Sequence, residues 1–158
     1  MNSSARRAVL ILVVSGAVTT LAAQAPDPRV GTWTLNVAKS KYDPGPAPTS
    51  QTLTVEATGQ GERILSDAVN ADGTHTTTQY SANFDGKDYP LTGSPIADSV
   101  ALKRIDAHST ERADKKGGKV VQTFRRVVSK DGKTMTVTVT GTNVKGQAVN
   151  NVIVFEKR

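Results

Sequence analysis

The sequence predicts an all-β protein, an antiparallel up-and-down meander β-barrel of about 8–10 strands preceded by a signal peptide. Three observations predict it. Short segments of alternating apolar and polar residues recur from residue 31 to residue 158, glycine-containing turns separate them, and no segment has the apolar spacing of an amphipathic helix. Short turns join neighbouring strands as antiparallel pairs, and closing such a meander removes its two exposed edges.

Residues 1–25 have the pattern of a signal peptide. Arg6 and Arg7 form a basic start, and the apolar run that follows, Ala8 to Val18, is shorter than the roughly 20 residues that a membrane-spanning helix needs. The small residues after which cleavage is expected are Ala22, Ala23 and Ala25. We therefore expect an exported protein, periplasmic or extracellular, with no transmembrane segment and with one domain over residues 26–158.

Composition excludes several classes. The chain has 158 residues and no cysteine, so one domain without disulfides or thiol chemistry is expected. Its formal net charge of +6 would fall by two with the loss of Arg6 and Arg7, and the remaining excess is spread along the chain. This mild charge indicates solubility and gives no indication of a nucleic-acid partner. We expect the protein to be a monomer.

The first strand is expected at Gly31–Leu35, which contains Trp33, the only tryptophan of the chain. Between Ser40 and Ser50, prolines at positions 44, 46 and 48 exclude both a helix interior and a central strand. We expect an extended loop there that crosses one mouth of the barrel, with Tyr42 as a plug.

The remaining strands are bounded by turn residues, as at Asp85-Gly86 and Asp131-Gly132, where glycine accepts the positive φ of a hairpin. They are expected at residues 51–58, 62–69, 74–84, 87–91, 99–105, 108–114, 119–128, 134–142 and 151–158. The first and last strands should pair and close the barrel. A two-layer sandwich is the alternative, but it needs longer crossing connections than these turns provide.

Four short motifs resemble the lipocalin and fatty-acid-binding (calycin) barrels, in particular the small bacterial secreted lipocalin-like proteins. They are Gly31-x-Trp33, Ser40-Lys-Tyr42, Lys130-Asp-Gly-Lys133 and the closing Val154-Phe-Glu-Lys157. The resemblance implies that Trp33 packs across the closed end of the barrel, with Lys157 or Arg158 lying over its ring.

The sequence departs from the fatty-acid-binding pattern in two places. The proline-rich loop stands where that family has two helices, so no helical gate is expected. Ile153 and Phe155 stand where the resemblance would place an Arg-x-Tyr pair that holds a ligand carboxylate. The side chains that bind the fatty-acid carboxylate in that family are therefore missing.

The expected cavity wall follows from the alternation of side chains along each strand. Met135, Val137 and Val139 share one face and threonines the other, while Val120, Gln122, Phe124, Arg126 and Val128 share a face of the preceding strand. The candidate ligand-binding residues are Leu53, Val55, Tyr80, Phe124, Arg126, Val137, Ile153 and Phe155. The aromatic residues Tyr80, Phe84 and Tyr89 fit either a ligand wall or plain core.

Arg126 is the best candidate for an inward-pointing cation, and a shift of the facing by one residue would turn its neighbour Arg125 inward instead. A buried arginine is costly without a partner. That partner is either an anionic group of a ligand, or a Glu, Asp or backbone carbonyl of the protein itself.

The sequence contains no recognisable catalytic set, and no metal or cofactor is expected. His75 and His108 are far apart, without ligand spacing, and are interpreted as surface strand residues. A basic cluster consists of Lys103, Arg104, Arg112, Lys115, Lys116 and Lys119. It fits either a weak contact with anionic envelope components or a solvated edge that resists aggregation.

Two functions are consistent with this fold. The first is an exported, non-enzymatic barrel that binds a small hydrophobic or amphipathic ligand in its interior. The alternative is an envelope structural or protein-interaction module whose barrel is solid and holds no ligand. An interior void above roughly 300 Å³ would favour the first.

Overall fold

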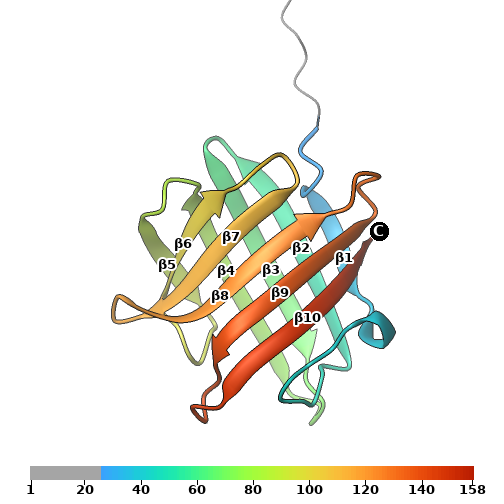
Figure 1. Ribbon diagram of the computed structural model, residues 1–158, viewed down its shortest axis with the longest axis vertical. Helices are drawn as coiled ribbons and strands as arrows, with labels where there is room; N and C mark the ends of the chain where they lie inside the picture. Colours follow the sequence, from blue (N-terminus) through green and yellow to red (C-terminus); the bar gives the residue numbers. More distant parts are fainter. Residues whose placement is uncertain (1–25) are drawn as a thin grey trace, which may run out of the picture.

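Residues 26–158 form a closed barrel of ten strands in the computed structural model, which describes this part of the chain (Figure 1). The predicted signal peptide lies outside the described residues. The strands are β1 (Gly31–Leu35), β2 (Ser50–Thr58), β3 (Gly61–Val69), β4 (His75–Asn83), β5 (Asp88–Thr92), β6 (Ser99–Arg104), β7 (Ser109–Lys116), β8 (Lys119–Val128), β9 (Thr134–Thr142) and β10 (Ala148–Lys157). A single 3₁₀ turn, η1 (Val37–Lys39), follows β1.

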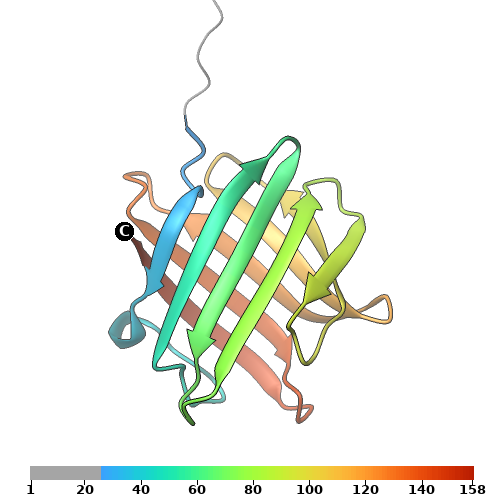
Figure 2. The same ribbon diagram turned by 180° about the vertical axis from the view of Figure 1, so that it is seen from behind.

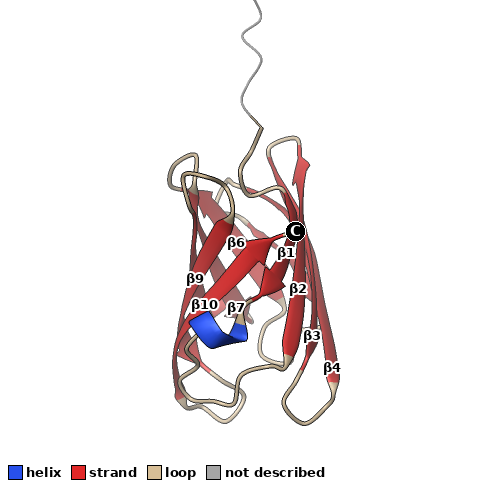
Figure 3. Ribbon diagram, turned by 90° about the vertical axis from the view of Figure 1, so that its right-hand side faces the viewer, coloured by secondary structure: helices blue, strands red, loops and turns tan. Residues whose placement is uncertain are grey.

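Each strand pairs antiparallel with its sequence neighbours, and β1 pairs with β10 to complete the circuit. Trp33 lies opposite Lys157, and Leu35 lies opposite Phe155. Figures 1 and 2 show the two faces of this continuous wall, and Figure 3 shows the barrel flattened when it is seen edge-on. The predicted closure is confirmed, and a sandwich with free edges is excluded.

Most strand bounds lie within two residues of those expected, but the last strand begins three residues early, at Ala148. The turn before it is tight because Asn143 and Gln147 are already hydrogen-bonded through Asn143 N and Gln147 O at 3.0 Å. His108, expected in a strand, lies instead in the turn before β7, where its backbone N–H donates to Asp106 Oδ1 at 2.8 Å. That expectation was wrong for His108, whereas His75 is an exposed strand residue.

A bulge corrects the predicted facing of β8. Lys115 pairs with Val120 while Asp114 pairs with Gln122, so β8 has one extra residue at this point. An extra residue inverts the alternation of side chains beyond it. Val120, expected to share the inner face with Gln122, is therefore 56% exposed.

The meander places alternate connections at opposite ends of the barrel. The leader, residues 26–30, lies at one end together with the C-terminus and the β2–β3, β4–β5, β6–β7 and β8–β9 turns, and we call this the leader end (Figure 1). The other end, the loop end, has the proline-rich loop and the remaining turns. That loop does not simply cross the mouth, because Lys41 forms a backbone bridge with Val152 of β10.

The core faces inward from the strands. On β9, Met135, Val137 and Val139 are buried and the threonines between them are half-buried or exposed, as predicted. Trp33 and Met135 have no exposed surface. Over residues 26–158, no helix has the length and apolar character required to cross a membrane.

Candidate ligand-binding site

The barrel encloses a cavity of about 430 Å³. This volume lies within the range of roughly 300–1,000 Å³ that is typical of small-molecule sites. The cavity extends to the loop end, where the exposed Val144 is part of its wall. Its large apolar side chains are Leu53, Ile64, Leu91, Ile96, Leu102, Phe124, Val137, Ile153 and Phe155.

Seven of the eight predicted ligand-binding residues line this cavity: Leu53, Tyr80, Phe124, Arg126, Val137, Ile153 and Phe155. Val55 does not. It is buried in the core opposite Gly31, close to the leader end, and is not part of the wall. Among the candidate aromatics, Tyr80 lines the cavity, whereas Phe84 and Tyr89 pack against the core outside it.

A buried ion pair joins Glu62 of β3 to Arg126 of β8 across the interior. Arg126 Nη2 donates to the two carboxylate oxygens at 2.7 and 2.5 Å, and the two side chains are 4% and 8% exposed. Tyr80 donates its hydroxyl to Glu62 Oε1 at 2.9 Å, and Arg126 Nε donates to Thr110 Oγ1 at 3.0 Å. Of the two partners considered for the inward arginine, the structure therefore supplies the protein carboxylate.

Arg125 points the other way. Its side chain is 57% exposed, and it lies 3.6 Å from the carboxylate of Glu111 on the outer face. The predicted choice of Arg126 as the inward arginine agrees with this arrangement.

A second ion pair lies on β7, where Arg112 and Asp114 are two residues apart and so face the same side. Arg112 Nε lies 2.7 Å from Asp114 Oδ1, and Nη2 donates to Oδ2 at 3.0 Å. The guanidinium carbon lies 3.8 Å from the centroid of the Phe124 ring and 5.3 Å from that of Tyr80. Sequence reasoning missed this pair, because Thr110, Arg112 and Asp114 make the inner face of β7 polar.

The basic cluster is consequently divided. Arg112 lies inside, Arg104 lies at the leader end, and Lys115 Nζ binds Asp88 on the surface at 2.6 Å. The six residues therefore do not form one patch.

Burial and neighbouring charges change the protonation of the cavity groups. Burial raises the pKa of Tyr80, the Glu62 charge adds to this rise, and both interior arginines oppose it. Burial likewise raises the pKa of Asp114, against the opposing effect of Arg112. At the loop end, burial raises the pKa of Tyr42 to about 12, and its hydroxyl is buried without a hydrogen-bond partner. Both phenols are therefore protonated near neutral pH.

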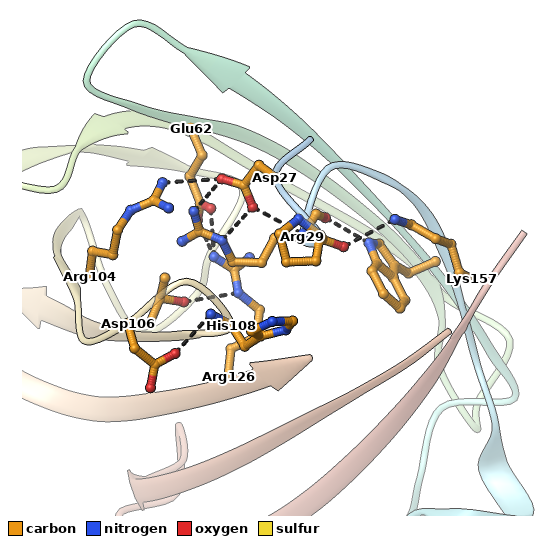
Figure 4. Close-up of polar contacts among 11 residues, drawn as sticks. Asp27, Arg29, Glu62, Arg104, Asp106, His108, Arg126 and Lys157 are labelled. Carbon is orange, nitrogen blue, oxygen red and sulfur yellow. Dashed lines mark hydrogen bonds and ion pairs between the residues drawn. The ribbon is translucent and has the colours of Figure 1, made fainter. Parts of the chain in front are cut away.

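The leader end holds a second buried arginine, Arg29 (Figure 4). Arg29 is 1% exposed and is paired with Asp27, to which Arg104 Nη2 also donates at 3.1 Å. The guanidinium carbons of Arg29 and Arg104 lie 4.9 and 4.6 Å from the centroid of the Phe84 ring. Although burial raises the pKa of Asp27, hydrogen bonds from the side chain and backbone of Arg29 outweigh it and hold that pKa well below its ordinary value.

Trp33 completes the leader end. Its Nε1 donates to the carbonyl of Arg29 at 2.9 Å, and Lys157 Nζ lies 5.0 Å from its ring centroid. This is the placement that the resemblance implied, with Lys157 rather than Arg158 over the ring. Arg158 instead donates to Thr34 Oγ1 at 2.7 Å.

No family model and no curated protein matches the chain. Among solved structures it is similar to the crystal structure of zebrafish ileal bile acid-binding protein complexed with cholic acid, with a TM-score of 0.52 and 13% sequence identity. The match covers 83% of this chain and 99% of that chain. Together with the closed ten-strand meander, this likeness shows that the chain has the barrel fold of that bile acid-binding protein, in agreement with the fold that the sequence motifs implied.

Proposed function

We propose that this protein is an exported, monomeric, non-enzymatic barrel that binds a small hydrophobic or amphipathic molecule in its interior. The observation that carries the proposal is the cavity of about 430 Å³, which has a largely apolar wall. A solid barrel would have filled this space with side chains. The solved structure with a similar fold contains cholic acid, an amphipathic molecule, which supports this kind of ligand for the fold.

Export is part of the proposal and rests on the sequence. Arg6 and Arg7 before the apolar run Ala8–Val18 support secretion, followed by cleavage after Ala22, Ala23 or Ala25. The location would then be periplasmic or extracellular.

No chemical step is assigned to the cavity. The charged side chains that line it, Glu62, Arg112, Asp114 and Arg126, are held in two ion pairs. A structural role is enough to explain ion pairs of this kind, without any catalytic role.

Tryptophan substitutions at adjacent positions of β10 test the proposal. Ile153 lines the cavity, whereas Val152 is 39% exposed. The exported, processed chain is purified, its N-terminus is determined by mass spectrometry, and it is titrated with the neutral fluorescent probe Nile red. Saturable binding is expected, with Ile153→Trp raising the Kd about tenfold or more, which corresponds to about 1.4 kcal/mol.

Val152→Trp is the matched control, because it adds the same side chain outside the wall. It should leave the Kd within about twofold. Absence of saturable binding to the unmodified protein, or an equal loss in both variants, would contradict an interior site. An intact chain with its first 25 residues retained would contradict the proposed processing.

A further inference from the structure

The charges of the cavity cancel within the protein itself. Among the described residues that line the cavity, two are acidic and two are basic, and each arginine has its own carboxylate: Glu62 with Arg126, and Asp114 with Arg112. A ligand that carries a charge would therefore enter a cavity with no unpaired opposite charge to receive it.

The first pair leaves Arg126 little capacity for a ligand carboxylate. Its Nη2 is bound to Glu62 and its Nε to Thr110. An anion that approached the remaining Nη1 would lie beside the Glu62 carboxylate. Two like charges in a buried site strongly oppose each other's ionisation, and an unpaired buried charge is expensive.

Arg112 is likewise paired with a carboxylate of the protein, that of Asp114. Two nitrogens of the Arg112 fork lie 2.7 and 3.0 Å from the Asp114 oxygens. The Arg112 guanidinium also lies against Phe124 and near Tyr80, at 3.8 and 5.3 Å from the ring centroids. Nη2 is therefore hydrogen-bonded to Asp114 and the guanidinium lies against Phe124, so an anion that approached Arg112 would also lie beside the Asp114 carboxylate.

Neutral hydrogen-bonding groups are available on a different part of the wall. Gln51, Ser66, Thr76 and Thr78 come from the adjacent strands β2, β3 and β4 and line the cavity. Gln51 Nε2 donates to Ser66 Oγ at 2.8 Å, and Thr76 Oγ1 accepts from Asn70 Nδ2 at 2.9 Å. Hydroxyl and amide groups both donate and accept, so they suit an alcohol or amide on a ligand without requiring charge.

Resting on the function proposed above, we propose that the cavity selects uncharged amphipathic molecules, with an apolar body and a neutral hydroxyl or amide head, over carboxylates. Glu62 is the specificity-determining residue, because it keeps Arg126 from binding an anion. The contrast is with the similar solved structure, whose ligand is cholic acid.

Competition between decanol and decanoate for bound Nile red at pH 7.5 tests this selectivity. The two molecules share an alkyl chain and differ in the charge of the head. The unmodified protein should bind decanol at least about tenfold more tightly than decanoate. Glu62→Gln keeps the shape and a hydrogen bond but frees the Arg126 charge, and should bind decanoate about tenfold more tightly while its decanol affinity stays within about threefold.

Glu111→Gln is the matched control, since Glu111 pairs with Arg125 on the outer face of the same wall. It should change neither affinity. Asp114→Asn is a second variant that frees Arg112 by the same logic, and it keeps the test valid if Glu62→Gln folds poorly.

Tighter decanoate than decanol binding in the unmodified protein, or no gain of decanoate affinity in either folded variant, would overturn the selectivity. Failure of the interior site itself has a different signature, because Nile red would then show no saturable binding in any variant.

Discussion

The leader end and the cavity both contain arginines beside aromatic rings, yet they differ in what surrounds these groups. At the leader end, Arg29 is paired with Asp27 and lies against Phe84, within packed protein. In the cavity, Arg112 lies against Phe124 in a similar way but faces an open volume. The same side-chain chemistry therefore packs within the protein in one region and lines an open cavity in the other.

The difference comes from how each region is filled. The leader adds extra side chains at one end of the barrel, where they pack with Trp33 and with Lys157 of the last strand. A ten-strand wall encloses more space than its own inward side chains fill, so the middle remains open. Substitutions at the leader end should therefore change stability and spare ligand affinity, and cavity substitutions should change affinity.

Replacing Trp33 should have the largest effect on stability. Trp33→Ala removes a fully buried ring and its hydrogen bond to Arg29, and should lower the free energy of unfolding by about 3–5 kcal/mol in urea titrations followed by circular dichroism. Trp33→Phe keeps a ring and should lose about 1–3 kcal/mol. The Nile red Kd of the folded protein should stay within about twofold. A stable Trp33→Ala protein with weakened Nile red binding would contradict the expectation that the leader end determines stability and the cavity determines affinity.

Arg126→Met changes a cavity residue that should also affect stability. It leaves Glu62 buried with only the Tyr80 hydroxyl, and should cost about 3 kcal/mol of unfolding free energy in the same urea assay. The double variant Glu62→Gln/Arg126→Met should recover most of this loss. Arg125→Met, on the exposed face, should change stability by no more than about 0.5 kcal/mol. Equal losses for Arg125 and Arg126 would mean that burial of the pair is unimportant.

The ion pair of Asp27 at the leader end should make the unfolding free energy depend on pH. Its pKa is depressed in the folded state, so its contribution to stability is present above the ordinary value of 3.8 and is lost as the pH falls toward the folded pKa. Asp27→Asn should lower the unfolding free energy by about 2 kcal/mol at pH 7, less than for a fully buried pair because Asp27 is partly exposed. The gap between the variant and the unmodified protein should narrow as the pH falls below about 4. A gap that is constant from pH 7 to pH 3 would rule out this ion pair as its cause.

Lys157→Met should have the smallest effect. It removes a cation 5.0 Å from the Trp33 ring centroid while keeping most of the apolar stem, and should cost about 0.5–2 kcal/mol in thermal and urea unfolding. Lys119→Met, in an exposed position at the start of β8, is the control and should be neutral. A loss of unfolding free energy as large as that of Trp33→Ala would mean that Lys157, and not the Trp33 ring, contributes most to stability at the leader end.

The fold was largely predictable because its signals are local. Turn residues such as Asp131-Gly132 end one strand and begin the next, and the alternation of Met135 and Val137 with threonines assigns the inner face of β9. A meander with short turns then leaves closure as the way to remove both edges, and the pairing of Trp33 with Lys157 confirms it. The cavity residues on strongly alternating strands followed from the same reasoning.

The site was predictable only where the pattern of a single strand determined it. The β7–β8 bulge, which turns Val120 outward, depends on how two strands pair, and the residue pattern of neither strand predicts it. The inner face of β7 is polar, so Arg112 could not be distinguished from a surface residue.

The residue pattern alone predicted the strands, the turns and the order of pairing, because each depends on residues close together in the chain. The folded barrel was needed to choose between Arg125 and Arg126, to bring Glu62, 64 residues away, to Arg126, and to leave a volume of about 430 Å³ beside them. Contacts across a barrel depend on strand register, tilt and closure together. These are properties of the whole wall, and they set the charge that a ligand would meet.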